Sequence, residues 1–110
     1  MYSTGEQVYE LIGKSKSSGN AIRHSFSHGI IPAFCSSRLH YHLEAEETFY
    51  FIKGKGSMIV DERTFTVNSG DTVLISPQER HHIVNNSQNE LEFIVVCAPG
   101  WNLDDSVFLD

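Results

Sequence analysis

The sequence predicts an all-β fold, either a small antiparallel β-barrel or a jelly roll. From about Ala21 onward, apolar and polar residues alternate with period two in short runs, which Gly, Pro, Asn and Ser separate. No stretch carries the apolar stripe of a helix beyond two turns, although EQVYELI and LDDSVFL could each form a short helix. Closing or doubling the sheet removes most exposed strand edges, which favours a barrel or a jelly roll.

Each predicted strand combines this alternation with residues that suit a pleated surface, chiefly Thr, Val, Ile, Phe and Tyr. The predicted strands span residues 21–29, 36–42, 47–53, 56–61, 64–67, 72–75, 81–86 and 91–97. Between them, VDERTF predicts a hairpin, and VNSGDT predicts a tight reversal in which Gly70 takes a positive φ. NNSQNE predicts a polar loop.

One domain, residues 1–110, is expected, because a chain of 110 residues can form one substantial core. Residues 1–20 are expected to form an N-terminal extension, and residues 98–110 a C-terminal tail. No apolar run approaches the roughly 18 residues of a membrane helix, and the first residues lack the pattern of a secretory signal. We therefore expect a cytoplasmic protein without a membrane partner, with Cys35 and Cys97 as free thiols.

The charge of the chain argues against a nucleic-acid partner. The formal net charge is −6, and the eight Lys and Arg residues are scattered along the sequence. A small anionic ligand is not excluded, because a single buried arginine can bind an anion whatever the net charge.

Histidines and one glutamate form the most informative pattern. Residues two apart on a strand share a face, so Arg38, His40 and His42 are expected to project together. A hairpin after His42 would bring the Glu47 carboxylate back towards the two imidazoles, and His81 begins a later strand. Imidazole nitrogens and carboxylate oxygens are the usual ligands of one divalent transition metal (Fe, Mn, Ni, Zn or Cu), and the sequence does not distinguish among these.

These residues resemble the two motifs of the cupin superfamily, in its single-domain, conserved-barrel form (cupin 2). The first motif is Gly, five residues, His-x-His, three or four residues, Glu, six residues, Gly. The second is Gly, five residues, Pro-x-Gly, two residues, His, three residues, Asn. The matching positions are His40, His42, Glu47 and Gly54 in the first motif, and Gly70, His81 and Asn85 in the second.

Three positions depart from the motifs. Phe34 and Gln78 stand where the family has Gly, and Ser76 stands where it has Pro. None of them is a ligand position, so the departures concern loop geometry more than metal binding.

The two motifs span residues 34–85, and the predicted strands extend the resemblance to about residue 97. It implies a cupin-like double-stranded β-helix. In such a barrel His40, His42, Glu47 and His81 would hold the metal, and His82 would face the other way. It also implies a homodimer, as in many single-domain relatives. The alternative for the same residues is a polar network in a cupin that has lost its metal. A second metal at His24 and His28 is a weaker hypothesis.

The surroundings of the metal are expected to form a substrate pocket. Arg38 is either a clamp for a carboxylate or phosphate, or an arginine at the barrel mouth that reaches solvent or pairs with an acidic loop residue. Phe49, Phe51 and Ile83 are expected in the core, with those near the metal also walling the pocket. Trp101 could plug one barrel end, dock against a partner subunit or cover the pocket.

The resemblance points to a small metalloenzyme acting on a polar, oxygen-rich or anionic small molecule. Dioxygenase, decarboxylase, isomerase and lyase chemistry all occur in similar cupins. Glu47, and Arg38 as an anchor for the substrate, are the expected catalytic residues. The alternative is a module that binds or senses a small ligand without turning it over.

Overall fold

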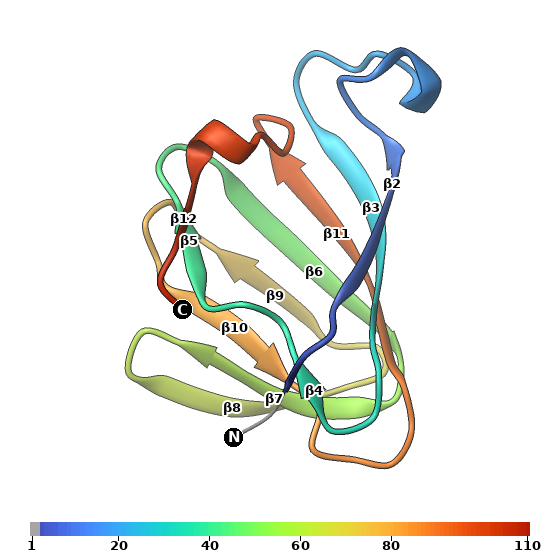
Figure 1. Cartoon of the computed structure of the whole chain (residues 1–110), viewed down its shortest axis with the longest axis vertical. Coiled ribbons are helices and arrows are strands. Elements are labelled where there is room, and N and C mark those ends of the chain that lie inside the picture. The colour runs from blue at the N-terminus through green and yellow to red at the C-terminus, as the bar shows by residue number, and fades with distance from the viewer. Residues whose placement is uncertain (1–2) are drawn as a thin grey trace.

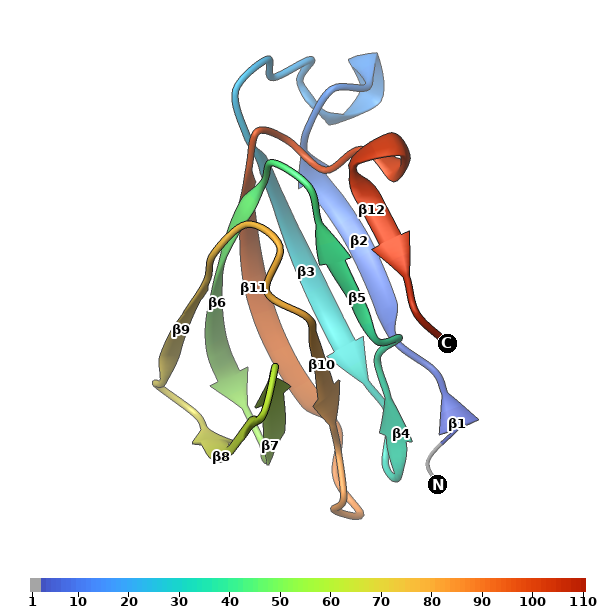
Figure 2. The same ribbon diagram turned by 90° about the vertical axis from the view of Figure 1, so that its left-hand side faces the viewer.

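Two curled sheets make up the fold in the computed structural model, which describes residues 3–110 with the exception of the Lys16 side chain. One sheet has seven strands: β1 (Ser3–Thr4), β4 (Cys35–Ser36), β5 (His40–His42), β7 (Lys55–Val60), β8 (Arg63–Asn68), β10 (His81–Val84) and β12 (Ser106–Phe108). The other has five: β2 (Gln7–Ile12), β3 (Ser25–Ile31), β6 (Glu46–Lys53), β9 (Thr72–Ile75) and β11 (Leu91–Ala98). The all-β double-stranded β-helix predicted from the sequence is confirmed, and Figures 1 and 2 show the two sheets from perpendicular directions.

Alternation along the strands places the core between the sheets. In β11 every second residue from Leu91 to Cys97 is buried, and β3 shows the same alternation from Ser25 to Ile31. The core cluster consists of Ile31, Phe49, Phe51, Met58, Val60, Val67, Ile75, Ile83, Leu91, Phe93 and Val95. Burial of these apolar side chains is the main force that holds the sheets together.

The turns follow the sequence in most places. β7 and β8 form the predicted hairpin, with Val60 paired to Arg63. Gly70 has a φ of +95°, as expected for the reversal before β9. Gly54 has a φ of +86°, and a Cβ there would lie 2.5 Å from the carbonyl oxygen of Glu90. Only glycine therefore fits this corner, where the chain passes from β6 to β7 in the other sheet.

The N-terminal residues differ from expectation, because they belong to the barrel. The short helix considered for EQVYELI is wrong: residues 7–12 are strand β2, paired antiparallel with β3. β1 pairs with β4 in the opposite sheet, so the segment crosses from one sheet to the other. Hydrogen bonding to the free edge of β3 outweighs the weak local preference for helix.

The predicted strand over residues 36–42 is interrupted, and the tail contributes a strand that was not expected. Residues 37–39 separate β4 from β5, and the backbone N–H of Leu39 donates to the Asp110 side chain instead of a strand neighbour. A short 3₁₀ turn, η2 (Leu103–Asp105), leads into β12, which pairs with β5. Another 3₁₀ turn, η1 (Lys16–Ser18), lies between β2 and β3. Within residues 3–110, no helix is long and apolar enough to cross a membrane.

Two structural roles inferred from the sequence are confirmed. Asn85 is fully buried, and its amide donates to the carbonyl oxygens of Ile31, Pro32 and Asn89. Cys35 and Cys97 are free thiols.

Candidate metal centre

Three imidazoles and one carboxylate meet between the two sheets. His40 and His42 lie on β5, and His81 begins β10 directly opposite His40 in the strand register. Glu47 lies on β6 in the other sheet. One candidate ligand atom from each of the four residues lies within 4.8 Å of the others, a spacing that a single metal ion can bridge.

The route by which Glu47 arrives differs from the predicted hairpin. β5 and β6 do not pair with each other, since β5 is bonded to β10 and β12, while β6 is bonded to β9 and β11. The chain crosses between the sheets after His42, and the backbone N–H groups of Glu44 and Ala45 donate to the Asp105 carboxylate there. Glu47 therefore faces the histidines across the interior of the barrel.

Each histidine is held by its outer nitrogen. Nδ1 of His40 lies 2.8 Å from the carbonyl oxygen of Arg38, and Nδ1 of His81 lies 2.9 Å from that of Glu79. Nδ1 of His42 lies 3.1 Å from the Ser106 hydroxyl on β12. A carbonyl accepts only from a protonated nitrogen, so His40 and His81 carry a hydrogen on Nδ1, which directs Nε2 towards the centre as a ligand.

The Nε2 atoms of His42 and His81 both lie close to the same carboxylate oxygen of Glu47. Nε2 of His81 and Nε2 of His42 each lie 3.0 Å from Oε1 of Glu47. Among the described residues, Nε2 of His42 is nevertheless a buried atom without a hydrogen-bond partner. Buried polar atoms are normally satisfied, and a cation between these atoms would satisfy both nitrogens and the carboxylate. The residues present therefore fit a divalent metal.

Charge states in the cluster suit metal binding. Burial acts to raise the pKa of Glu47, but the close His42 and His81 imidazoles outweigh it and lower the pKa to about 2. Burial and the nearby His81 lower the pKa of His40 to about 4. For His81, burial acts to lower the pKa, yet the hydrogen bond and charge of Glu47 raise it overall. At neutral pH Glu47 is ionised and His40 is neutral, as ligands must be.

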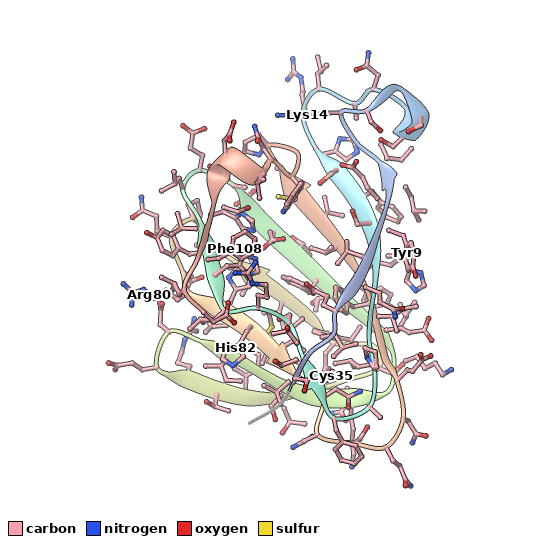
Figure 3. The ribbon with its side chains drawn as sticks, viewed as in Figure 1. Tyr9, Lys14, Cys35, Arg80, His82 and Phe108 are labelled. Carbon is pink, nitrogen blue, oxygen red and sulfur yellow. The ribbon has the colours of Figure 1, made fainter. Side chains whose placement is uncertain are left out.

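A cavity of about 330 Å³ adjoins the cluster, with His40 and Glu47 in its lining. Its apolar wall includes Phe49, Phe93, Trp101 and Phe108. The Phe108 ring lies 5.5 Å from the His40 ring, centroid to centroid, and Figure 3 labels this residue on the tail. We call this space the site cavity; its volume suits a small organic molecule.

Not all of the residues expected to wall a pocket line the site cavity. Phe49, Trp101 and Arg38 line it, whereas Phe51 and Ile83 are buried in the core cluster and do not. Trp101 is 46% exposed, so it does not plug the barrel. Trp101 lies at the cavity wall instead.

Arg38 lies at the edge of the site cavity with its charge already paired. Nε of Arg38 lies 3.2 Å from Oδ1 of Asp110, and Nη2 donates to the Asp110 carbonyl oxygen. The guanidinium also stacks 4.1 Å over the Phe108 ring. This is the acidic pairing considered from the sequence, with a partner in the tail instead of a loop.

Glu6 is the cavity residue that sequence reasoning missed. It lines the site cavity together with Val8 and Glu10, which share its face of the N-terminal segment. Although the Glu6 residue is solvent-exposed by accessible surface, surrounding protein atoms, and then the nearby Glu47 carboxylate, raise its pKa to about 7. The period-two spacing of Glu6, Val8 and Glu10 was the available signal, obscured by the helical interpretation of the same stretch.

The remaining histidines lie outside the cluster. His82 follows His81 and faces the other way, where it lines a shallower surface pocket with Arg38 and Asp110. His28 is paired with Glu92 at 3.1 Å, and His24 is exposed. In the described part of the chain, His40, His42, Glu47 and His81 form the one group of metal-ligating geometry.

Its two curled sheets place the chain in the class of double-stranded β-helix proteins, and the His₃Glu cluster lies between those sheets. The family model described as "Cupin domain" matches residues 28–97, well over half of the chain. The chain therefore belongs to the cupin domain family, as its motifs predicted.

Individual relatives agree with this assignment. The chain is 29% identical over 106 residues to "Uncharacterized protein MJ1618" of Methanocaldococcus jannaschii, covering 96% of this chain and 83% of that protein. A conserved protein with a double-stranded β-helix domain from Klebsiella pneumoniae superposes with a TM-score of 0.81 at 14% identity. The match covers 96% of this chain and 84% of that chain. Streptomyces Pac13, described as a nucleoside dehydratase, superposes with a TM-score of 0.80 at 13% identity. The match covers 99% of this chain and 82% of that chain. At such identities the two structures show the fold alone.

Proposed function

We propose that this cupin is a metalloenzyme that holds one divalent transition metal with His40, His42, Glu47 and His81 and acts on a polar small molecule in the site cavity. The observation that carries the proposal is the buried, unpartnered Nε2 of His42, which shares Oε1 of Glu47 with His81. A metal bound there would supply Lewis-acid or redox chemistry to a substrate oxygen.

The chain's own residues prepare the site in three ways. The backbone carbonyls of Arg38 and Glu79 and the Ser106 hydroxyl fix the orientation of the imidazoles. The aromatic wall excludes water from one side of the cavity and offers flat surfaces to a substrate. Burial of Glu47 and His42, which are 6% and 2% exposed, strengthens electrostatic interactions at the cluster.

The structural relatives support a small-molecule ligand. Streptomyces Pac13 has been solved with uridine, a neutral molecule of a size suited to a pocket of several hundred Å³. The native substrate and reaction of this chain are not transferred from it.

Metal analysis of the purified protein tests the proposal. His81→Ala is expected to abolish stoichiometric metal, because it removes one of four ligands and leaves Glu47 with a single imidazole neighbour. His82→Ala is the matched control, since it changes the adjacent histidine on the opposite face and is expected to retain the metal. Unchanged metal content in His81→Ala would refute the site.

The bound metal and its behaviour separate the reaction classes. Iron together with oxygen uptake on addition of a substrate would favour an oxygenase, and zinc or nickel without redox behaviour would favour an isomerase or lyase. A non-catalytic binding module is the competing outcome, and any turnover that depends on Glu47 would exclude it.

We also propose a cytoplasmic homodimer. The outer face of the five-stranded sheet exposes Tyr50, Ile52 and Leu74, with 46%, 40% and 59% of their surface accessible. An antiparallel sheet that faces water normally carries polar residues on that side. A second copy packed on this face would cover these apolar side chains.

A further inference from the structure

The N-terminal segment places a carboxyl group in the site cavity. Between β1 in one sheet and β2 in the other, Glu6 lies where the chain crosses the gap between the sheets. Glu6, Val8 and Glu10 line the cavity and are themselves solvent-exposed, while Tyr9 lies on the opposite face of β2 (Figure 3). The part of the cavity lining that the N-terminal segment supplies is therefore acidic.

The two glutamates of this wall have different surroundings. They are four positions apart along extended chain, which corresponds to about 13 Å. Glu10 accepts a hydrogen bond of 3.4 Å from the Ser18 hydroxyl. Among the residues whose side chains are described, none forms a hydrogen bond or ion pair with the Glu6 carboxyl group. The Glu6 carboxyl group is thus available to form hydrogen bonds with solvent or with a ligand.

Glu6 lines the same cavity as two of the candidate metal ligands, His40 and Glu47. A small molecule that hydrogen-bonds to Glu6 would therefore occupy the cavity that adjoins the metal cluster.

The positive charge in the lining is not free to receive an anion. Arg38 is the cationic side chain of the site cavity, and Asp110 already binds it through the side chain and the backbone carbonyl. A carboxylate or phosphate would have to displace Asp110 and would also meet the carboxylates of Glu6 and Glu10. Like charges within a partly enclosed cavity repel strongly.

We propose that Glu6 is a ligand-binding residue of the site cavity, where it accepts a hydrogen bond from a hydroxyl or ammonium group of a neutral or cationic small molecule. The apolar part of this molecule packs on Trp101 and on the phenylalanines of the cavity lining, which are Phe49, Phe93 and Phe108. The inference deepens the proposed function by naming the ligand class, and replaces the anionic substrate considered from the sequence.

Fluorescence of Trp101 tests this inference directly. Trp101 is the one tryptophan of the chain and lines the site cavity, so its emission reports entry of a ligand. The probes are benzylamine, benzyl alcohol and benzoate, which share a ring and differ in the charge and donor capacity of the attached group. Each is titrated at pH 8, where Glu6 is ionised and benzylamine is still cationic, into the full chain in metal-free and zinc-loaded form, as wild type and as Glu6→Gln.

In the metal-free protein, benzylamine and benzyl alcohol are expected to bind more tightly than benzoate. Glu6→Gln is expected to weaken benzylamine binding about tenfold, as loss of a charge-assisted hydrogen bond does. Glu62→Gln, on the β7–β8 turn away from the cavity, is the matched control and is expected to change nothing.

Three results would overturn the proposal: tightest binding of benzoate, equal benzylamine affinity in wild type and Glu6→Gln, or no response of Trp101 to any probe at its solubility limit. Because these measurements use the metal-free protein, they can succeed when the metal site fails. Failure of the protein to take up zinc would bear on the metal proposal alone and leave the role of Glu6 intact.

Discussion

Replacement of Gln78 by Gly is expected to stabilise the protein. Gln78 has a φ of +69°, and it follows Pro77 in a turn closed by a hydrogen bond from the Glu79 N–H to the Ser76 carbonyl oxygen. Proline followed by a residue with positive φ is the pattern of a type II turn, whose third residue is normally Gly. The turn also supports the site, since the Gln78 N–H donates to the carbonyl oxygen of His42 at 2.7 Å.

The magnitude follows from the backbone alone. Gln78 is exposed and its side chain has no hydrogen bond among the described residues, so its removal costs little. A non-glycine residue in the left-handed region costs about 1–2 kcal/mol. The greater flexibility of Gly in the unfolded chain returns about 0.4–1 kcal/mol of this. Gln78→Gly should therefore be more stable than Gln78→Ala by about 0.5–1 kcal/mol, or about 2–6 °C in Tm.

Thermal and urea unfolding of the metal-free variants measures the difference. Gln78→Ala is the matched control, because it removes the same side chain and keeps the Cβ that makes a positive φ costly. Equal stability of the two variants, or a more stable Ala variant, would refute the assignment of strain to this turn. The same comparison applies to Phe34, whose φ is +56°.

Four further predictions concern the site, the core, Glu6 and the assembly. Ser106→Ala should lower metal affinity about tenfold, measured by competition with a chelator, because it frees the outer nitrogen of His42. Asn85→Ala should lower the free energy of unfolding by about 2–4 kcal/mol, since three backbone carbonyls lose their donor. Glu6→Gln should raise the Tm of the metal-free protein at pH 8 but not at pH 4. Tyr50→Glu should convert the proposed dimer to a monomer in sedimentation experiments.

The pH dependence of Glu6 has a definite sign. The pKa of Glu6 rises from its ordinary value of 4.5 to about 7 on folding. Between these pH values the folded chain therefore binds more protons than the unfolded chain. The contribution of Glu6 to the free energy of unfolding is therefore lost as the pH rises through this window. A Gln at position 6 carries no charge, so the variant does not suffer this loss. Glu47 acts in the opposite direction: its pKa of about 2 means that its stabilisation is present above pH 4.5 and is lost as the pH falls towards 2.

Controls and contrary results are specific to each prediction. Ser17→Ala, at an exposed serine far from the cluster, should leave metal affinity unchanged, and equal losses in both serine variants would exclude a positioning role for Ser106. An Asn85→Ala protein as stable as wild type would mean that water replaces the amide. A Tm gain for Glu6→Gln that is the same at both pH values would show that charge is not its cause. Thr48→Glu, a polar position on the same face as Tyr50, tests whether added charge alone dissociates the dimer.

Motif departures illustrate how far local sequence determines local structure. Phe34 and Gln78 occupy positions where the family has Gly, and both keep the left-handed backbone that Gly would adopt. The loop geometry is thus retained although the residue that favours it is absent. The surrounding hydrogen bonds, including those from the turn to β5, impose a conformation that the side chains alone would not choose.

Much of the fold and the four candidate ligands could be predicted from the sequence, because both depend on spacing along the chain. Period-two alternation indicated most of the strands, and parity within one strand placed His40 and His42 on one face. The tertiary structure decided what spacing cannot encode: that Glu47 faces the histidines from the opposite sheet, that residues 3–12 form strands in both sheets, and that the tail holds His42 through Ser106. These arrangements arise from pairing between strand edges far apart in sequence, which depends on the free hydrogen-bonding groups of the assembled sheets and not on any local pattern.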